Sequence, residues 1–460
     1  MKNQPTLDPS FVPAVLWNRD FQSRVQQSGG GEPFAIALER PGGSISRFDT
    51  RIFSAPDGSQ LKDSVRYVER ILKFLLWQRG GATISLGGNR EVAGQVADFY
   101  RPDGERSFDC KFIGDQVYLQ PLVFRLGSVD EVPEAKETTV PLGRHLEGCR
   151  IGFDLGGSDR KSAALIDGEV VFSEEIEWDP YFESDPEYHY QGINDSLKRA
   201  AAHLPRVDAI GGSAAGVYVN NEVRVASLFR GVSEEDFDKR VRRMFFDLKK
   251  EWNDVPFEVV NDGEVTALAG AMSTGQNGVL GVAMGTSEAV GYVNPEGHIT
   301  SWLNELAFAP VDYRENAPVD EWSGDHGCGA QYFCQQAVAR LAPAAGLEYP
   351  DGMGFPERLI EVQKLMKEGD SRAGDIYDTI GTCFGYSIAH YADFYEIENV
   401  LILGRVTSGE GGERIIANAQ AVLAGEFPEL HEKISLRTPG EKEKRHGQSI
   451  AAASLPALDE

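Results

Sequence analysis

Two patterns of apolar residues alternate along the chain. Short apolar runs that end at glycine, proline or Asp-Gly predict strands, and longer segments with an apolar residue every three or four positions predict helices. Residues 1–33 contain Pro5, Pro9, Pro13 and three consecutive glycines, and predict an irregular arm. In the rest of the first third, strands are expected over 34–38, 44–53 and 82–86, helices over 61–78 and 90–100, and a hairpin over 108–126.

The remaining sequence alternates strands and helices, as in an α/β protein. Strands are expected over 163–166, 169–172, 207–210, 257–260, 278–284, 289–293, 399–403 and 434–436. Helices are expected over 193–204, 234–252, 265–272, 333–341, 357–367, 375–395, 413–423 and 447–455. An apolar strand also precedes Asp154.

Residues 1–148 are expected to form an α+β region of their own. They end in a segment, 128–148, that is rich in Glu, Pro and Thr and is typical of a linker. The region holds none of the chemical motifs described below, so its expected role is packing or oligomerisation, and a homodimer is left open. An alternative is that it is a degenerate copy of the next region, because both run strand, strand, helix, strand, Gly-Gly.

Charge and cysteine content narrow the class of protein. The formal net charge of −26 argues against nucleic acid and against an anionic membrane surface as the main partner. Five scattered cysteines in 460 residues do not resemble a disulfide framework, and favour a reducing compartment. The first twenty residues lack the pattern of a secretory leader, and no apolar run is long enough to span a bilayer. A cytoplasmic protein is therefore expected.

The first chemical motif is the turn that follows the strand ending at Asp154. Gly156, Gly157 and Ser158 come next, before the chain re-enters as a strand. Glycines allow an anionic ligand to approach the backbone N–H groups closely, and a carboxylate beside them suits a magnesium ion held near phosphates. An ordinary hairpin with a surface aspartate is the alternative interpretation.

A second aspartate, Asp262, lies at a strand-to-helix junction directly after Asn261. Asp262 could cap the helix. It could also serve as a general base that takes the proton of a hydroxyl group as that oxygen attacks a phosphoryl group, with Asn261 holding the substrate. Between the two aspartates, the small residues 211–216 end at Gly216 and permit close approach of a ligand, although a tight packing turn would look the same.

A second strand–glycine–hydroxyl–strand hairpin contains Gly285, Thr286 and Ser287. Their N–H and O–H groups can donate to phosphate oxygens. Two such hairpins with a strand–Asp–helix junction between them are far more specific than any one of these motifs alone.

With these motifs, residues 149–460 resemble the ROK family of sugar kinases, repressors and open reading frames, in the actin and hexokinase superfamily. The resemblance implies two actin-like (ribonuclease H-like) α/β lobes around a cleft, with the N-terminal α+β domain added. The small lobe would span 149–260, with the C-terminal segment 440–460 returning to it, and the large lobe would span 261–439.

The resemblance also implies roles for individual residues. Asp154, Gly156, Gly157 and Ser158 would form the first phosphate loop, with Asp154 acting on Mg²⁺ indirectly, and Gly285, Thr286 and Ser287 would form the second. Asn261, Glu305 and Gly216 would contact the sugar, Asp262 would be the base, and Gly404 would lie near the adenosine. A surface role for Glu305 is the alternative.

The sequence also departs from the family pattern. The second phosphate loop has fewer glycines than usual, and Phe308 stands where the family has a metal-binding histidine. The remaining candidates for the family's zinc are His326, Cys328 and Cys334, and these are fewer than the four ligands of a structural site. Zinc is therefore not expected, and inert buried cysteines are.

These observations together predict an enzyme that uses ATP and Mg²⁺ to phosphorylate a hydroxyl group of a small sugar or sugar derivative. Two alternatives stay open: a sugar-sensing regulator or binding protein without catalysis, and an acyl-group kinase of the same superfamily. A DNA-binding regulator should carry a basic helix–turn–helix, which the first third does not clearly show.

Overall fold

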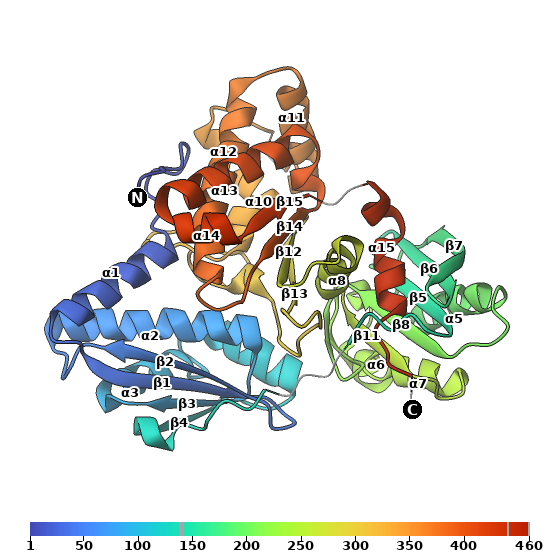
Figure 1. Cartoon of the computed structure of the whole chain (residues 1–460), viewed down its shortest axis with the longest axis horizontal. Coiled ribbons are helices and arrows are strands. Elements are labelled where there is room, and N and C mark those ends of the chain that lie inside the picture. The colour runs from blue at the N-terminus through green and yellow to red at the C-terminus, as the bar shows by residue number, and fades with distance from the viewer. Residues whose placement is uncertain (138–141, 351, 439–440, 459–460) are drawn as a thin grey trace.

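The computed structural model describes residues 1–137, 142–350, 352–438 and 441–458. Three larger sheets succeed one another along the chain, each with its own helices (Figure 1). The predicted linker over 128–148 and the predicted C-terminal segment 440–460 fall partly outside the described residues.

The N-terminal region is built on a sheet with the strand order β2-β1-β3-β4. Strands β1 and β2 form the expected hairpin, and the long helix α2 connects β2 to β3. Its elements are α1 (Ala14–Gln27), β1 (Glu32–Glu39), β2 (Ile45–Ile52), α2 (Gly58–Arg79), β3 (Thr83–Gly87), α3 (Arg90–Phe99), α4 (Ser107–Asp109), η1 (Cys110–Tyr118), β4 (Val123–Gly127) and η2 (Val129–Glu131).

Two predictions for this region are wrong. Helix α1 replaces the expected irregular arm, because Pro13 sits at its N-cap and Phe21 and Val25, one turn apart, are fully buried. The expected hairpin over 108–126 is a π-helix, η1, followed by a single strand, β4, that runs parallel to β3. Gly114-Asp115 therefore lies within a helix and not in a turn.

The second sheet has the order β11-β8-β5-β6-β7 and carries the first chemical motif. Its elements are β5 (Cys149–Leu155), β6 (Asp159–Ile166), β7 (Glu169–Glu177), α5 (Pro186–Ala201), β8 (Ala209–Ala214) and β11 (Phe257–Asn261). A small hairpin and short helices connect β8 to β11: β9 (Val217–Val219), β10 (Glu222–Val225), η3 (Ser227–Phe229), α6 (Glu234–Asp236), η4 (Phe237–Val241) and α7 (Met244–Glu251). The single helix expected over 234–252 is thus broken by a π-helical turn.

Strand direction decides against an internal duplication. In the second sheet β5 and β8 are parallel, whereas the corresponding strands of the N-terminal sheet, β1 and β3, are antiparallel. The hypothesis of a degenerate copy is therefore wrong.

The third sheet has the order β13-β12-β14-β15. Its strands are β12 (Val279–Met284), β13 (Glu288–Val293), β14 (Asn399–Leu403) and β15 (Ser435–Arg437). The helices of this part are η5 (Leu306–Phe308), α9 (Ala330–Phe333), α10 (Gln335–Ala344), α11 (Phe355–Lys367), α12 (Ser371–Tyr391), η6 (Arg405–Thr407), α13 (Glu410–Glu426) and α14 (Pro428–Lys433).

Two helices join the second and third sheets. Helix α8 (Asp262–Thr274) leaves the end of β11 and packs against β12 and β13 (Figure 1). Helix α15 (Glu441–Ala453) packs against β5, β6 and β8 on one side and against α8 on the other. The chain boundaries of the proposed lobes stay a prediction.

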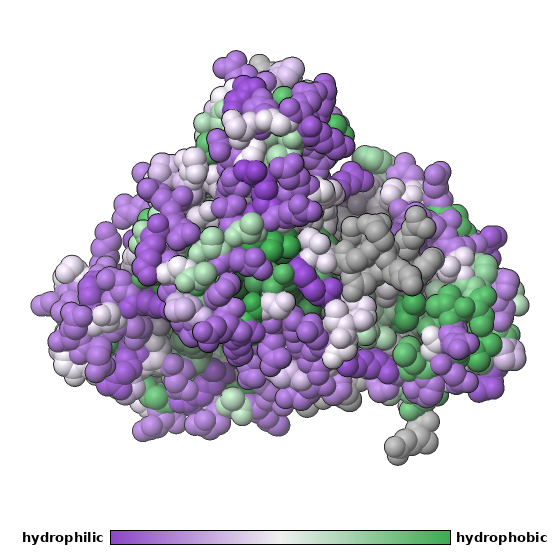
Figure 2. Space-filling model, turned by 45° about the horizontal axis from the view of Figure 1, so that its top comes forward, coloured by the Kyte–Doolittle hydropathy of each residue, from purple (hydrophilic) through white to green (hydrophobic). Residues whose placement is uncertain are grey.

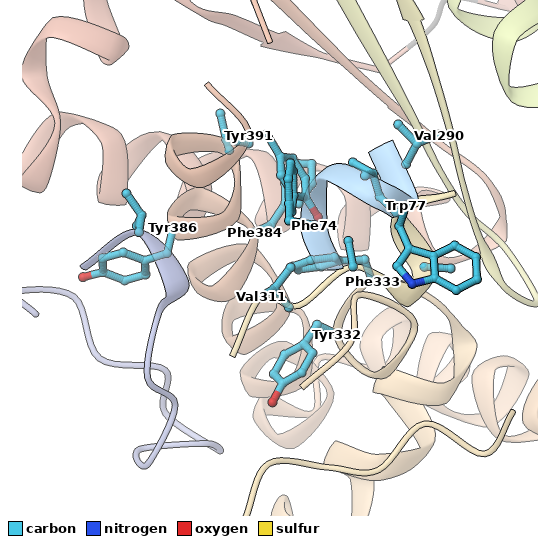
Figure 3. Close-up of a cluster of buried hydrophobic side chains, with 14 of the residues drawn as sticks. Phe74, Trp77, Val290, Val311, Tyr332, Phe333, Phe384, Tyr386 and Tyr391 are labelled. Atoms are coloured by element: carbon cyan, nitrogen blue, oxygen red, sulfur yellow. The ribbon is translucent and has the colours of Figure 1, made fainter. Parts of the chain in front are cut away.

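The largest hydrophobic core is shared by the N-terminal region and the third sheet. It contains Trp77 of α2 together with Met284 of β12 and Phe384 of α12. Figure 3 shows Phe74 and Trp77 of α2 among aromatic side chains that come from later segments. Hydrophilic residues cover most of the face in Figure 2. None of the helices in the described ranges is long and apolar enough to cross a membrane.

Candidate active site

The first site residues lie at one edge of the second sheet, where three neighbouring parallel strands end. Residue pairing places Leu155 of β5 beside Ala214 of β8, and Ala214 beside Asn261 of β11. Adjacent strands are about 4.8 Å apart, so the ends of β5 and β11 are separated by about 10 Å. Ligands of open α/β sheets bind at this carboxyl edge.

Asp154 is buried at this edge. Its Oδ1 accepts a hydrogen bond of 2.6 Å from the hydroxyl group of Ser213, and Lys161 Nζ lies 3.9 Å from its Oδ2. Burial raises the pKa of Asp154, while the Ser213 hydrogen bond and the Lys161 charge oppose that rise. The carboxylate is thus held in place by one short bond and keeps a second oxygen for a ligand.

The loop after Asp154 is closed by its own backbone. Gly156 N–H donates to the carbonyl of Asp159 over 2.9 Å, and Trp178 Nε1–H donates to the carbonyl of Gly156 over 2.8 Å. In the described part of the chain, the amide groups of Gly157 and Ser158 donate to no protein acceptor. Free backbone donors of this kind fit an anionic ligand.

The sequence left open whether Asp262 caps α8 or acts as a base, and the structure shows that Asn261 is the cap. Asn261 is the N-cap of α8: its Oδ1 accepts from Gly263 N–H over 2.7 Å, and its Nδ2 donates to the carbonyl of Gly216 over 2.7 Å. Asp262 accepts a longer bond of 3.0 Å from the same N–H group. Because Asn261 caps the helix, the Asp262 carboxylate is left for chemistry.

Two glycines bring Asp262 against the third sheet. A Cβ on Gly291 of β13 would collide with the carbonyl oxygen of Gly263, and a Cβ on Gly263 would lie 2.9 Å from the carbonyl oxygen of Val290. Only glycine permits two backbones to approach this closely. The first turn of α8 is therefore in contact with β13, close to the second predicted phosphate loop.

That second loop, Gly285, Thr286 and Ser287, joins β12 to β13. Gly285 N–H donates to the carbonyl of Ser287, and the amide groups of Thr286 and Ser287 donate to no acceptor among the described residues. Ala283 of β12 pairs with Leu403 of β14, so Gly404 lies at the same edge of the sheet as this loop. The structure thus places the second loop and Gly404 together.

Glu305 is half-buried on the segment that follows the β12–β13 hairpin, and its carboxyl group interacts with that of Asp262. Burial, and then the charge of Asp262, raise the pKa of Glu305 to about 7. Burial, and then the charge of Asp154, raise the pKa of Asp262 to about 6. Asp262 therefore interacts through space with both Asp154 and Glu305, although the three come from separate segments.

Sequence reasoning missed several residues of this site. Ser213 and Lys161 lie against the predicted acid Asp154, and Asn304 bonds Glu264. Glu264 and Glu288 are further buried acids whose pKa values burial raises to about 8. Both oxygens of Glu288 lack a hydrogen-bond partner among the described residues. The only sequence sign of Glu264 and Glu288 is their position, two residues after Asp262 and directly after Ser287.

The three candidates for zinc binding have other partners. His326 Nδ1 lies 2.8 Å from the carbonyl of Ala317, and Cys334 Sγ donates to the carbonyl of Ala330 over 2.9 Å. Cys328 Sγ is 4.0 Å from Asp325. Within the described ranges, no three His, Cys, Asp or Glu side chains are grouped as metal ligands. These residues do not fit a zinc site.

A large cavity of about 1080 Å³ lies elsewhere. It is formed by α2, residues 95–106 and residues 312–326, and its lining includes Arg70, Arg106 and Asp325. None of the residues predicted to bind the sugar or the phosphates lines it. This cavity is therefore separate from the strand ends that carry Asp154 and Asp262.

Comparison with known proteins identifies the fold. No protein-family model and no curated protein sequence matches the chain. The ROK hexokinase from Thermus thermophilus aligns over 67% of this chain and 97% of its own, with a TM-score of 0.53 and 17% identity. A ROK family transcriptional regulator, a homolog of the E. coli MLC protein, aligns over 67% of this chain and 78% of its own, with a TM-score of 0.51 and 17% identity. The predicted two-lobed α/β fold is confirmed.

Proposed function

We propose that this chain, which has the fold of ROK proteins, transfers the γ-phosphoryl group of ATP to a hydroxyl group of a small sugar or sugar derivative. One observation carries the proposal. Asp262, a carboxylate with a raised pKa, is placed by α8 between the carboxyl edge of the second sheet and the glycine-containing hairpin of the third. A general base is most effective when its pKa lies near the working pH.

The two loops would hold the phosphate groups. The unbonded amide groups of Gly157, Ser158, Thr286 and Ser287 supply donors from two sheets, and Gly404 would lie near the adenosine. Asp154, whose Oδ2 accepts no hydrogen bond from a described residue and lies 3.9 Å from Lys161 Nζ, would hold Mg²⁺ indirectly, through water. When bound, the ion neutralises charge on the phosphate oxygens.

The sugar would lie against Asn261, Gly216 and Glu305, with the reacting hydroxyl group at Asp262. Asp262 takes the hydroxyl proton as that oxygen bonds to the γ-phosphorus, and the bond to the β-phosphate oxygen breaks to release ADP. Gly216 also holds Asn261 in place, because its carbonyl oxygen accepts a hydrogen bond from the Asn261 side chain.

A coupled assay of ADP release tests this proposal. A panel of hexoses, amino sugars and N-acetyl sugars is offered with Mg²⁺-ATP, and a set of short carboxylates is run beside it to test the acyl-kinase alternative. We expect ADP release that depends on one class of sugar. Release that depends only on carboxylates, or no release above ATP hydrolysis, would contradict a sugar kinase.

A sugar-binding regulator without catalysis is the second candidate. The likeness in fold to a ROK transcriptional regulator supports it. The retained carboxylates Asp154 and Asp262 favour the kinase, because a protein that only binds sugar needs no base. Calorimetric binding of a sugar without any ADP release would favour the regulator.

A further inference from the structure

Helix α2 of the N-terminal region is buried on nearly all sides. From Ser64 to Gln78 only Arg66 keeps intermediate exposure. A helix with this pattern is enclosed by other elements and does not lie on a surface. The N-terminal sheet covers one side of α2, and the large core shared with the third sheet covers the other (Figure 1).

The C-terminal end of α2 meets the segment that carries Glu305. The last carbonyl groups of a helix have no partner within the helix. Here the carbonyl of Gln78 accepts from Asn304 N–H over 2.8 Å, and the carbonyl of Trp77 accepts from Glu305 N–H over 2.9 Å. The backbone of the predicted sugar contact is therefore bonded directly to the N-terminal region.

Asn304 connects this contact to the rest of the site. It is buried, and its φ of +51° is a conformation that asparagine tolerates better than most residues. Its Nδ2 donates to Glu264 over 2.5 Å, and its Oδ1 accepts from the hydroxyl group of Tyr395 over 2.7 Å. Glu264 lies in the first turn of α8, two residues after Asp262.

Side-chain packing also connects α2 to residues 304–308. The ring of Trp77 lies 4.5 Å from that of Phe308 in η5, the short helix that follows Glu305. Figure 3 shows Trp77 of α2 in the same hydrophobic cluster as Val290 of β13. Main-chain bonds and side-chain packing thus hold residues 304–308 against one helix end.

We propose that α2 is a positioning element of the sugar site: its C-terminal end fixes Asn304 and Glu305 and so sets the geometry between Glu305 and Asp262. This gives residues 1–148 a function in substrate binding beyond packing or oligomerisation. The inference rests on the proposed function in one respect, namely that Glu305 contacts the sugar.

A matched pair of tyrosine variants tests the proposal. Tyr395→Phe removes the hydroxyl group that bonds Asn304. Tyr67→Phe removes a buried hydroxyl group near the middle of α2 that bonds Thr50 over 3.0 Å, away from the C-terminal end of the helix. We expect Tyr395→Phe to raise the KM for sugar about fivefold with the KM for ATP unchanged, as expected for the loss of one buried hydrogen bond. Tyr67→Phe should leave both KM values unchanged.

Hydrogen exchange gives a readout that does not depend on activity. We expect the amides of residues 304–308 to exchange at least tenfold faster in Trp77→Leu than in the wild type, and faster in Tyr395→Phe as well, but not in Tyr67→Phe. Unchanged exchange in both Trp77→Leu and Tyr395→Phe would overturn the proposal. Faster exchange with an unchanged KM for sugar would also overturn it.

These outcomes separate this proposal from the proposed function. If the wild type phosphorylates no sugar, the kinase proposal fails, and the exchange of residues 304–308 still decides whether α2 holds the Glu305 segment. If the wild type is active and the two variants match it in exchange and KM, the kinase proposal stands and the positioning role is wrong.

Discussion

Ser213 donates a hydrogen bond of 2.6 Å to Asp154 across two neighbouring parallel strands, β8 and β5. This bond fixes Asp154 to β8, the strand that lies between β5 and β11. It also opposes the rise in the pKa of Asp154 that burial causes. The orientation of Asp154 is thus set by a neighbouring strand and not by its own loop.

Replacing Ser213 by alanine should weaken nucleotide binding. Without this bond Asp154 loses a fixed orientation and its pKa rises further, so we expect the KM for Mg²⁺-ATP to increase about tenfold, as for a buried hydrogen bond to a charged group. The KM for sugar should stay unchanged. Ser162→Ala is the control, because Ser162 is buried in the adjacent strand β6 and its hydroxyl group has no partner among the described residues. Equal effects of the two changes would argue against a specific role for Ser213.

Replacing Asp262 by asparagine should abolish most of the turnover. The amide keeps the size of the side chain but cannot take a proton, so we expect kcat to fall by about 10²- to 10⁴-fold. Sugar affinity measured by calorimetry should change by less than about threefold, because only the transition state needs the base. Asp247→Asn, an exposed change on α7, is the control. Near-normal turnover in Asp262→Asn would remove Asp262 from the role of base.

Activity should fall at acidic pH through the titration of Asp262. The base must be ionised, and its pKa is raised to about 6, so kcat/KM should decline as the pH falls through about 6. Besides burial, the charge of Asp154 raises the pKa of Asp262, and replacing Asp154 by asparagine removes this charge. The acidic limb of the Asp154→Asn profile should therefore lie at lower pH. A limb that stays in place in this variant would show that another group controls it.

Replacing Lys73 by methionine should destabilise the N-terminal region. Lys73 is fully buried, with its Nζ 2.9 and 2.8 Å from the two oxygens of Asp109 and 3.2 Å from Asp325. Removing one partner leaves buried carboxylates uncompensated, so we expect the free energy of unfolding to fall by about 3–5 kcal/mol in urea titrations. Lys239→Met breaks an exposed pair with Glu235 and should cost less than about 1 kcal/mol. Similar losses in the two variants would contradict this account.

Replacing Glu288 by glutamine should flatten the dependence of stability on pH. Burial raises the pKa of Glu288 to about 8 from an ordinary value of 4.5, so the folded state holds a proton that the unfolded state releases between these values. The contribution of Glu288 to the free energy of unfolding is therefore fully present below about pH 4.5 and is lost as the pH rises through about 8. We expect the Tm to fall less between pH 5 and pH 9 in Glu288→Gln than in the wild type. Exposed Glu413→Gln should follow the wild-type curve, and a Glu288→Gln curve parallel to it would refute the prediction.

Local pattern determined the chemical motifs and most of the elements. The strand before Asp154, the junction at Asp262 and the hairpin at Thr286 can each be predicted from a few adjacent residues, because a short apolar run followed by glycine and small polar residues indicates a strand that ends in a turn. The same local reasoning failed for α1 and η1. Prolines precede α1 without entering it, and Gly114 sits in a helix whose π-helical hydrogen bonds leave no regular sequence period.

Tertiary structure decided which of these motifs meet. Strand β8 lies between β5 and β11 and brings Asp154 and Asp262 to one edge, and the close contact of Gly263 with Gly291 brings Asp262 to the second loop. The bonds from α2 to Asn304 and Glu305 join segments more than two hundred residues apart. Sequence periodicity shows that a face is buried but does not show what covers it, and the partner of each face is fixed only when the whole chain packs.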